Sequence, residues 1–140
     1  RERAMKYNYN DGGRAEAGYK GNANDCVVRS VAIATGRDYK EVYKELARVM
    51  ASYGHERSAR NNIPTKIVKT YLQGLGFEWI ATMGKGTGIQ HHMRADELPS
   101  GTYIVSLSKH LATVIDGTVH DNHDPRRGGT RGVYGIWRKR

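Results

Sequence analysis

The single cysteine of this 140-residue chain, Cys26, directly follows Asp25 and opens a run of apolar residues. A cysteine acts as a nucleophile when its thiolate is favoured, as at the first turn of a helix, and when a histidine base is within reach. Asp25 can cap a helix that begins at Cys26, so the sequence predicts the thiol at such a helix start. One cysteine excludes an intramolecular disulfide and a multi-cysteine zinc site. Cys26 is therefore either a nucleophile or an inert buried side chain.

A base for this thiol must come from the six histidines: His55, His91, His92, His110, His120 and His123. His55 stands in a polar segment, and His91 and His92 are neighbours whose side chains point to opposite faces of an extended chain. His110 begins a strand that leads into the Asp116-Gly117 pair, a typical two-residue hairpin turn. We expect His110 to be the base.

The turn also predicts which residue orients His110. With Asp116 and Gly117 as the two loop residues, His110 lies opposite His123, and Asp121 lies one diagonal step away on the same face. Asp124 faces the other side and is expected to serve the turn near Pro125. A turn with an odd number of residues, or a bulge, would favour Asn122 or Asp124 instead.

Three segments together resemble the papain-like cysteine peptidases, above all the small members encoded by phages or bacteria. These segments are residues 24–30 (NDCVVRS), 101–105 (GTYIV) and 110–121 (HLATVIDGTVHD). The resemblance implies a Cys26 nucleophile, a His110 base and an Asp121 orienter acting on an amide or thioester carbonyl. It also implies a peptide or protein substrate and no cofactor.

The oxyanion of such a reaction needs hydrogen-bond donors. Papain-like enzymes carry a glutamine about six residues before the cysteine, a position that Lys20 occupies here. The nearest amide side chains are Asn22 and Asn24, and either could donate to the developing charge.

Metal binding is the competing chemistry. His120, Asp121, His123 and Asp124 are dense potential ligands, but residues 120 and 123 point to opposite faces of a strand. No HExxH helix accompanies them. We expect no metal site.

Charge is concentrated near the C-terminal end of the sequence. The 23 basic and 14 acidic residues leave a net charge of +9, and residues 125–140 hold six cations without an acid. Such asymmetry favours an anionic partner, either nucleic acid bound without base preference or an acidic substrate. Arg126, Arg127 and Arg131 are the candidates for steering that substrate; otherwise these charges form a solvated surface.

Hydrophobic periodicity predicts helices first and an antiparallel sheet afterwards, an α+β fold of the papain-like type. The expected helices span 26–35, 39–51 and 64–76, and the expected strands 77–82, 102–108, 111–115, 118–122 and 132–137. A glycine-rich loop, 83–88, lacks the pattern of a phosphate-binding loop. Residues 1–24 read as an extended arm, and residues 25–140 as a single domain.

The sequence has no apolar run long enough for a membrane span. Its first ten residues, RERAMKYNYN, lack the apolar centre of a signal peptide, so we expect a cytoplasmic protein, in the host or in the virion if phage-encoded. The leading functional hypothesis is a thiol hydrolase. The alternative is a non-catalytic, basic, nucleic-acid-associated or virion protein that keeps the same fold.

Overall fold

The computed structural model describes residues 4–20, 23–60, 63–83, 86 and 88–139, and its fold is α+β. The helices are α1 (Cys26–Thr35), α2 (Tyr39–Ser52) and α3 (Thr65–Gly74), with a short 3-10 helix η1 (Arg127–Gly129). The strands are β1 (Lys6–Tyr9), β2 (Phe77–Ala81), β3 (His91–His92), β4 (Thr102–Leu107), β5 (His110–Ile115), β6 (Thr118–Asp121), β7 (Gly132–Val133) and β8 (Gly135–Lys139). None of the helices in these ranges is long and apolar enough to cross a bilayer.

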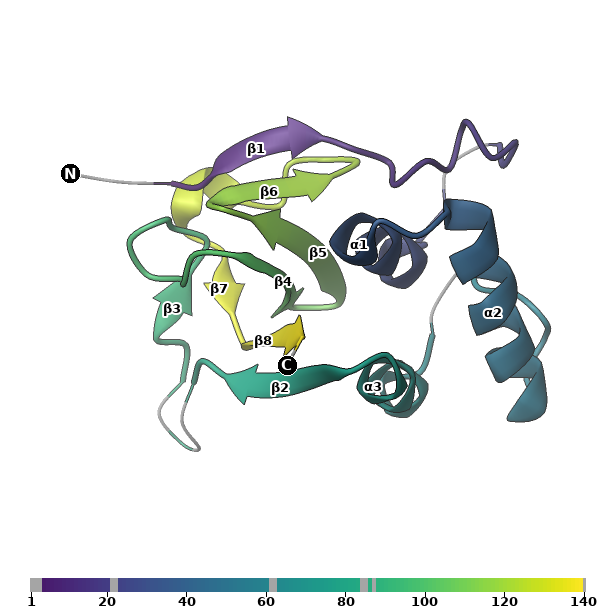
Figure 1. The fold of residues 1–140 in the computed structure, drawn as a ribbon. Coiled ribbons are helices and arrows are strands. Elements are labelled where there is room, and N and C mark those ends of the chain that lie inside the picture. The colour runs from purple at the N-terminus through teal and green to yellow at the C-terminus, as the bar shows by residue number, and fades with distance from the viewer. Residues whose placement is uncertain (1–3, 21–22, 61–62, 84–85, 87, 140) are drawn as a thin grey trace.

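Six strands form the main sheet, in the order β1-β6-β5-β4-β8-β2. All neighbours are antiparallel except β1 and β6, which run parallel, and β3 and β7 pair separately. The three helices lie together at one side of the sheet (Figure 1). Helix α1 packs closest to the sheet, against β5.

The core has two layers, one on each face of the sheet. Alternation along β4 shows this: Ile104 joins the cluster made with the helices, while Tyr103 and Val105 belong to the cluster on the opposite face. On that opposite face, Met93 and Val133 from the β3–β7 segment cover the strands. The sheet that carries His110 is thus held from both sides.

The predicted helices and hairpin agree with the structure closely. Helix α1 spans the residues expected, and the turn at Asp116 and Gly117 pairs Ile115 with Thr118 as the two-residue loop requires. The final predicted strand is broken in two, because Tyr134 interrupts it between β7 and β8.

The interpretation of residues 1–24 as an extended arm separate from the domain of residues 25–140 needs a correction over residues 6–9. Lys6–Tyr9 is extended, but it pairs in parallel with β6 at the edge of the main sheet, and the side chain of Met5 is buried. The pairing joins segments more than a hundred residues apart, so no local pattern indicates it. Residues 6–9 consequently belong to the sheet.

Candidate functional site

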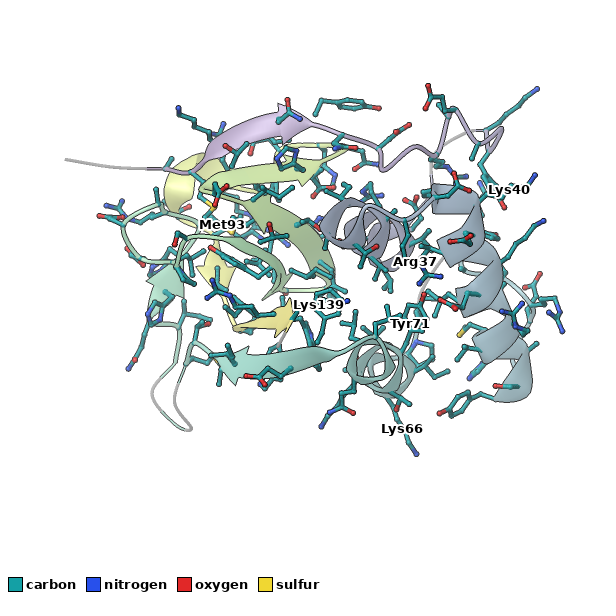
Figure 2. The ribbon with its side chains drawn as sticks, in the orientation of Figure 1. Arg37, Lys40, Lys66, Tyr71, Met93 and Lys139 are labelled. Atoms are coloured by element: carbon teal, nitrogen blue, oxygen red, sulfur yellow. The ribbon has the colours of Figure 1, made fainter. Side chains whose placement is uncertain are left out.

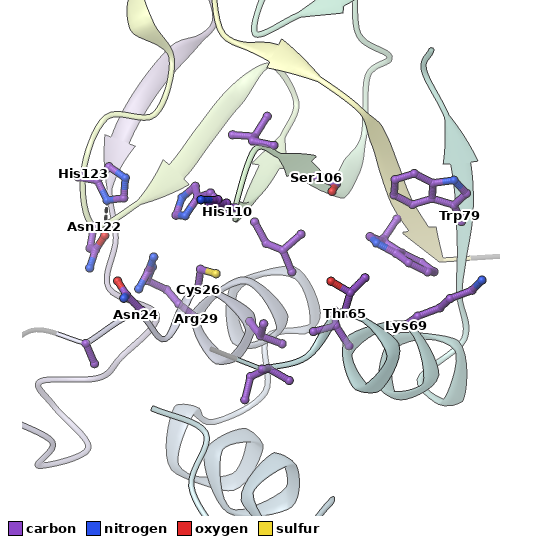
Figure 3. A pocket seen from close by; sticks show the side chains of 18 residues that line it. Asn24, Cys26, Arg29, Thr65, Lys69, Trp79, Ser106, His110, Asn122 and His123 are labelled. Carbon is purple, nitrogen blue, oxygen red and sulfur yellow. Dashed lines mark hydrogen bonds between the residues drawn. The ribbon is translucent and has the colours of Figure 1, made fainter. Parts of the chain in front are cut away.

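Cys26 and His110 line one groove because α1 and β5 begin at the same place in the fold. Helix α1 starts at Cys26 and packs along β5, where the Thr113 hydroxyl donates to the Ser30 carbonyl at 2.7 Å. This contact fixes the middle of the helix against the middle of the strand, and the first residues of both elements line the same groove. The groove between them has a volume of about 890 Å³ and exposes both side chains (Figure 3).

Asp121 holds His110 from the side away from solvent. The His110 Nε2 and the Asp121 Oδ2 are 2.5 Å apart, and Asp121 is only 1% exposed. The diagonal placement across the hairpin that the sequence predicts is therefore the one observed. Asp124 instead accepts hydrogen bonds from the backbone and side chain of Arg126, which is turn chemistry.

The charges of this pair stabilise one another. Burial alone would lower the pKa of His110, but hydrogen bonds with Asp121 and Cys26 outweigh it and raise that pKa to about 9. Burial would raise the pKa of Asp121, yet the hydrogen bond and charge of His110, with the charge of Arg29, lower it below its usual value. Near neutral pH the imidazole is thus cationic and the carboxylate anionic.

Arg29 is a member of the site that the sequence analysis missed. Its Nε donates to the Asp121 Oδ1 at 3.1 Å, and its Nη1 donates to the Asp25 Oδ1 one helical turn away. Arg29 is buried although it sits on an otherwise apolar helix. One feature of the sequence could have identified Arg29: it is a lone cation on an apolar helix, four residues after an aspartate.

The prediction that the Asp25 side chain caps α1 is wrong. Asp25 is the N-cap residue, but its carboxylate makes no capping hydrogen bond. It is buried, accepting from Arg29 and from the Tyr39 hydroxyl at 2.5 Å, with Arg14 at 3.8 Å. A buried carboxylate is satisfied better by cations and a hydroxyl than by one neutral amide.

These contacts form a buried line of alternating charges, which we call the charge relay line: Arg14, Asp25, Arg29, Asp121 and His110. The line runs from beneath the start of α1 to the imidazole beside Cys26. With His110 protonated it carries a charge of +1, because its three cations exceed its two carboxylates. An anion next to His110 would balance it.

His123 borders the same site. Its ring centroid lies 4.9 Å from that of His110, and its Nδ1 contacts the side chain of Asn122 at 2.8 Å. Ligand atoms of His110, Asp121 and His123 lie within 4.8 Å of one another. However, both oxygens of Asp121 are already engaged, one of them by the fixed positive charge of Arg29. The trio therefore fits a cation poorly.

The other potential metal ligands weighed from the sequence, His120 and Asp124, point elsewhere. The Nδ1 of His120 contacts the Asn8 side chain at 3.1 Å, across the β1–β6 pair. Asp124 is paired with Arg126. The dense run of residues 120–124 thus does not converge on one point.

Of the two predicted oxyanion donors, the structure describes Asn24 and not Asn22. Asn24 lines the groove near Cys26, whereas Asn22 lies outside the described residues. Lys20 lines a second hollow, and its carbonyl accepts from Arg14 at 3.1 Å. The backbone N–H of Cys26 belongs to the first helical turn, whose amides have no partner inside the helix.

The three arginines predicted to steer a substrate lie outside the groove lining. Arg126 pairs with Asp124 and donates to the Met5 carbonyl, and Arg131 donates to the Ser108 carbonyl at 2.9 Å. Arg127 is exposed on η1. Arg131 anchors the turn before His110 and is the best placed of the three to influence the site.

No protein-family model, curated protein or solved structure matches this chain. The geometry around Cys26 therefore carries the functional argument.

Proposed function

We propose that the protein is a thiol hydrolase that cleaves an amide or related acyl bond with Cys26, His110 and Asp121. One observation carries the proposal: a cysteine at a helix start shares one groove with a histidine that a buried carboxylate holds at 2.5 Å, and the cysteine helps to raise the pKa of that histidine. Acyl transfer requires a nucleophile, a base beside it, and a group that orients the base. An inert buried cysteine would need no such partners.

Each side chain has a distinct task. The Asp121 carboxylate accepts a hydrogen bond from the Nε2–H of His110, which fixes the ring and leaves Nδ1 for the thiol side. The thiolate of Cys26 attacks the carbonyl carbon, forming the C–S bond. The imidazolium then gives its proton to the leaving nitrogen as the C–N bond breaks, and a thioester on Cys26 remains.

Water completes the cycle. His110, now neutral, takes a proton from a water molecule that attacks the thioester. The C–S bond then breaks, the carboxylic acid product leaves, and the Cys26 thiolate is restored beside the imidazolium. In both halves the oxyanion is closest to the start of α1, where the Cys26 amide and the Asn24 side chain are the candidate donors.

A papain-like fold is part of this proposal. Helix α1 opens with the cysteine, the histidine begins a strand of an antiparallel sheet, and the groove lies between them. The chain order Cys26, His110, Asp121 is the order of that superfamily. We place residues 25–140 and the added strand β1 in one such domain.

An activated ester tests the proposal without knowledge of the natural substrate. We expect p-nitrophenyl acetate to acetylate Cys26 in a rapid burst that releases one p-nitrophenolate per protein, followed by slower release of acetate. Mass spectrometry locates the acetyl group. Cys26→Ala and His110→Ala should lose the burst while keeping a native circular dichroism spectrum. A burst of unchanged size in Cys26→Ala would remove the enzyme hypothesis.

The excess of basic charge favours a second function, non-catalytic association with nucleic acid. The cations of residues 125–140 make contacts in separate places. Arg138 donates to the Ser100 carbonyl and lies over the Tyr103 ring, while Arg126 is neutralised by Asp124. Dispersed and partly paired cations support only salt-sensitive binding without base preference.

A further inference from the structure

The groove continues from Cys26 to an aromatic end. Its lining passes from Asn24 and His123 through Cys26 to Lys69 and Trp79, which Figure 3 shows on the far side from the thiol. Trp137 completes this end, with its ring centroid 5.1 Å from that of Trp79. We call Lys69, Trp79 and Trp137 the aromatic subsite.

The indole of Trp79 is held in place yet remains accessible. It is 42% exposed, on the edge strand β2, while Trp137 beneath it is buried. A Cβ on Gly135 would stand only 2.3 Å from the Trp79 ring, so the indole lies directly on the glycine backbone of β8. A large exposed ring fixed in this way offers apolar contact area at little cost in conformational entropy.

The charges that face the groove are of one sign. Among its lining residues outside the Cys26–His110 pair the ionised side chains are Arg29, Lys69 and Lys109, and none is an aspartate or glutamate. Arg29 is neutralised within the charge relay line, whereas Lys69 and Lys109 are exposed and make no ion pair within the described ranges. The field along the groove therefore favours an anionic ligand.

We propose that the groove binds an acidic peptide segment, with an aromatic or large apolar side chain against Trp79 and a neighbouring carboxylate at Lys69. This inference rests on the proposed function and names the substrate class of the same site. The two exposed cations can pair with one or two carboxylates of a peptide. A nucleic-acid strand presents a phosphate at every nucleotide, so two cations would leave most of its charges unpaired. The apolar walls from Val68 and Leu111 also suit side chains of a peptide.

The test measures binding apart from catalysis. The protein is Cys26→Ala, and the probes are two hexapeptides with the same neutral dye, GDFGDG and GKFGKG, followed by fluorescence anisotropy at low salt. We expect the acidic peptide to bind about tenfold more tightly, and Lys69→Glu to reverse that preference. Trp79→Ala should weaken both peptides.

Lys66→Glu is the matched control. Lys66 is exposed on the same helix, α3, and points away from the sheet and groove (Figure 2). This change alters the net charge of the protein as Lys69→Glu does, so the preference for the acidic peptide should persist.

Equal affinity for the two peptides, no binding of either, or the same loss in both lysine variants would overturn the inference. Tighter binding of a dye-labelled dT hexamer that Lys69→Glu abolishes would overturn it in favour of a nucleic-acid ligand. These failures are distinguishable from failure of the proposed function, because the p-nitrophenyl acetate burst reports on Cys26 without the aromatic subsite.

Discussion

Within the part of the chain that the structure describes, two places combine an imidazole, a carboxylate and a guanidinium. They are the site cluster of His110, Asp121 and Arg29, and the surface cluster of His92, Glu97 and Arg94. In the site cluster the imidazole and carboxylate are 2.5 Å apart, with side chains 11% and 1% exposed. In the surface cluster they are 3.1 Å apart and 37% and 28% exposed. The same residue types thus meet in two very different environments.

The comparison shows that residue types alone do not make a site. Water screens the charges of the surface cluster, so its ion pairs gain little from their contact. In the site cluster, burial makes each charge depend on its partner. His110 of this cluster also shares the groove with Cys26, which lies at the start of α1. The same type of substitution should therefore change stability or activity far more in the site cluster than in the surface cluster.

The largest difference is expected from the two arginines. Arg29→Met leaves Asp25 and Asp121 buried without their shared cation, which should lower the free energy of unfolding by about 3–5 kcal/mol. Arg94→Met should cost about 1 kcal/mol or less, since its partners reach water. Urea unfolding measures both. Equal losses would mean that the charge relay line does not support the fold.

Removal of the orienting carboxylate should cost activity rather than stability alone. Asp121→Ala should lower the rate of the p-nitrophenyl acetate burst by up to about 10⁴-fold, the loss known for the orienting carboxylate of a serine triad. Asp124→Ala should stay near the wild-type rate, because Asp124 contacts Arg126 and not His110. The reverse ranking would show that Asp121 does not orient the base.

The contacts behind these two predictions differ in how far the sequence alone predicts them. The Asp116-Gly117 turn sets the register of its own hairpin, so the meeting of His110 and Asp121 follows from local rules. The role of Arg29 and the pairing of β1 with β6 are non-local: both depend on segments about a hundred residues away. Local patterns also suggested a capping role for Asp25, which burial beside Arg29 overrides.

The stability of the site cluster should change with pH in a defined window. The pKa of His110 is raised to about 9 in the folded state, so its stabilisation is complete below pH 6.5 and is lost as pH rises through about 9. The pKa of Asp121 is lowered, so its stabilisation is present above pH 3.8 and is lost as pH falls further. Urea unfolding of wild type and His110→Gln should therefore differ most between pH 3.8 and 6.5.

An NMR titration of His110 gives the sharper measurement of the same point. Asp121→Asn should lower the pKa of His110, because it removes the charge that holds the imidazolium. Glu97→Gln in the surface cluster should leave the titration of His110 unchanged. A His110 that titrates near 6.5 in the wild type would contradict the coupling.

The smallest effect is expected from the basic residues outside both clusters. Changing Arg126, Arg127 and Arg131 together to glutamine should slow association with an acidic substrate at low ionic strength and leave the maximal rate nearly unchanged. A short DNA duplex should bind the wild type weakly, with a dissociation constant of about micromolar or above, and release steeply with added salt. Tight binding with base preference would promote the nucleic-acid function.

The reactivity of Cys26 tests the central claim most directly. Iodoacetamide alkylation is measured near pH 6, well below the ordinary thiol pKa of about 8.5, with N-acetylcysteine as the reference. We predict that Cys26 in the wild type reacts at least about tenfold faster than the reference, and that His110→Ala removes this advantage. Alkylation of wild type and His110→Ala at one and the same rate, no faster than N-acetylcysteine, would contradict the claim that His110 activates Cys26.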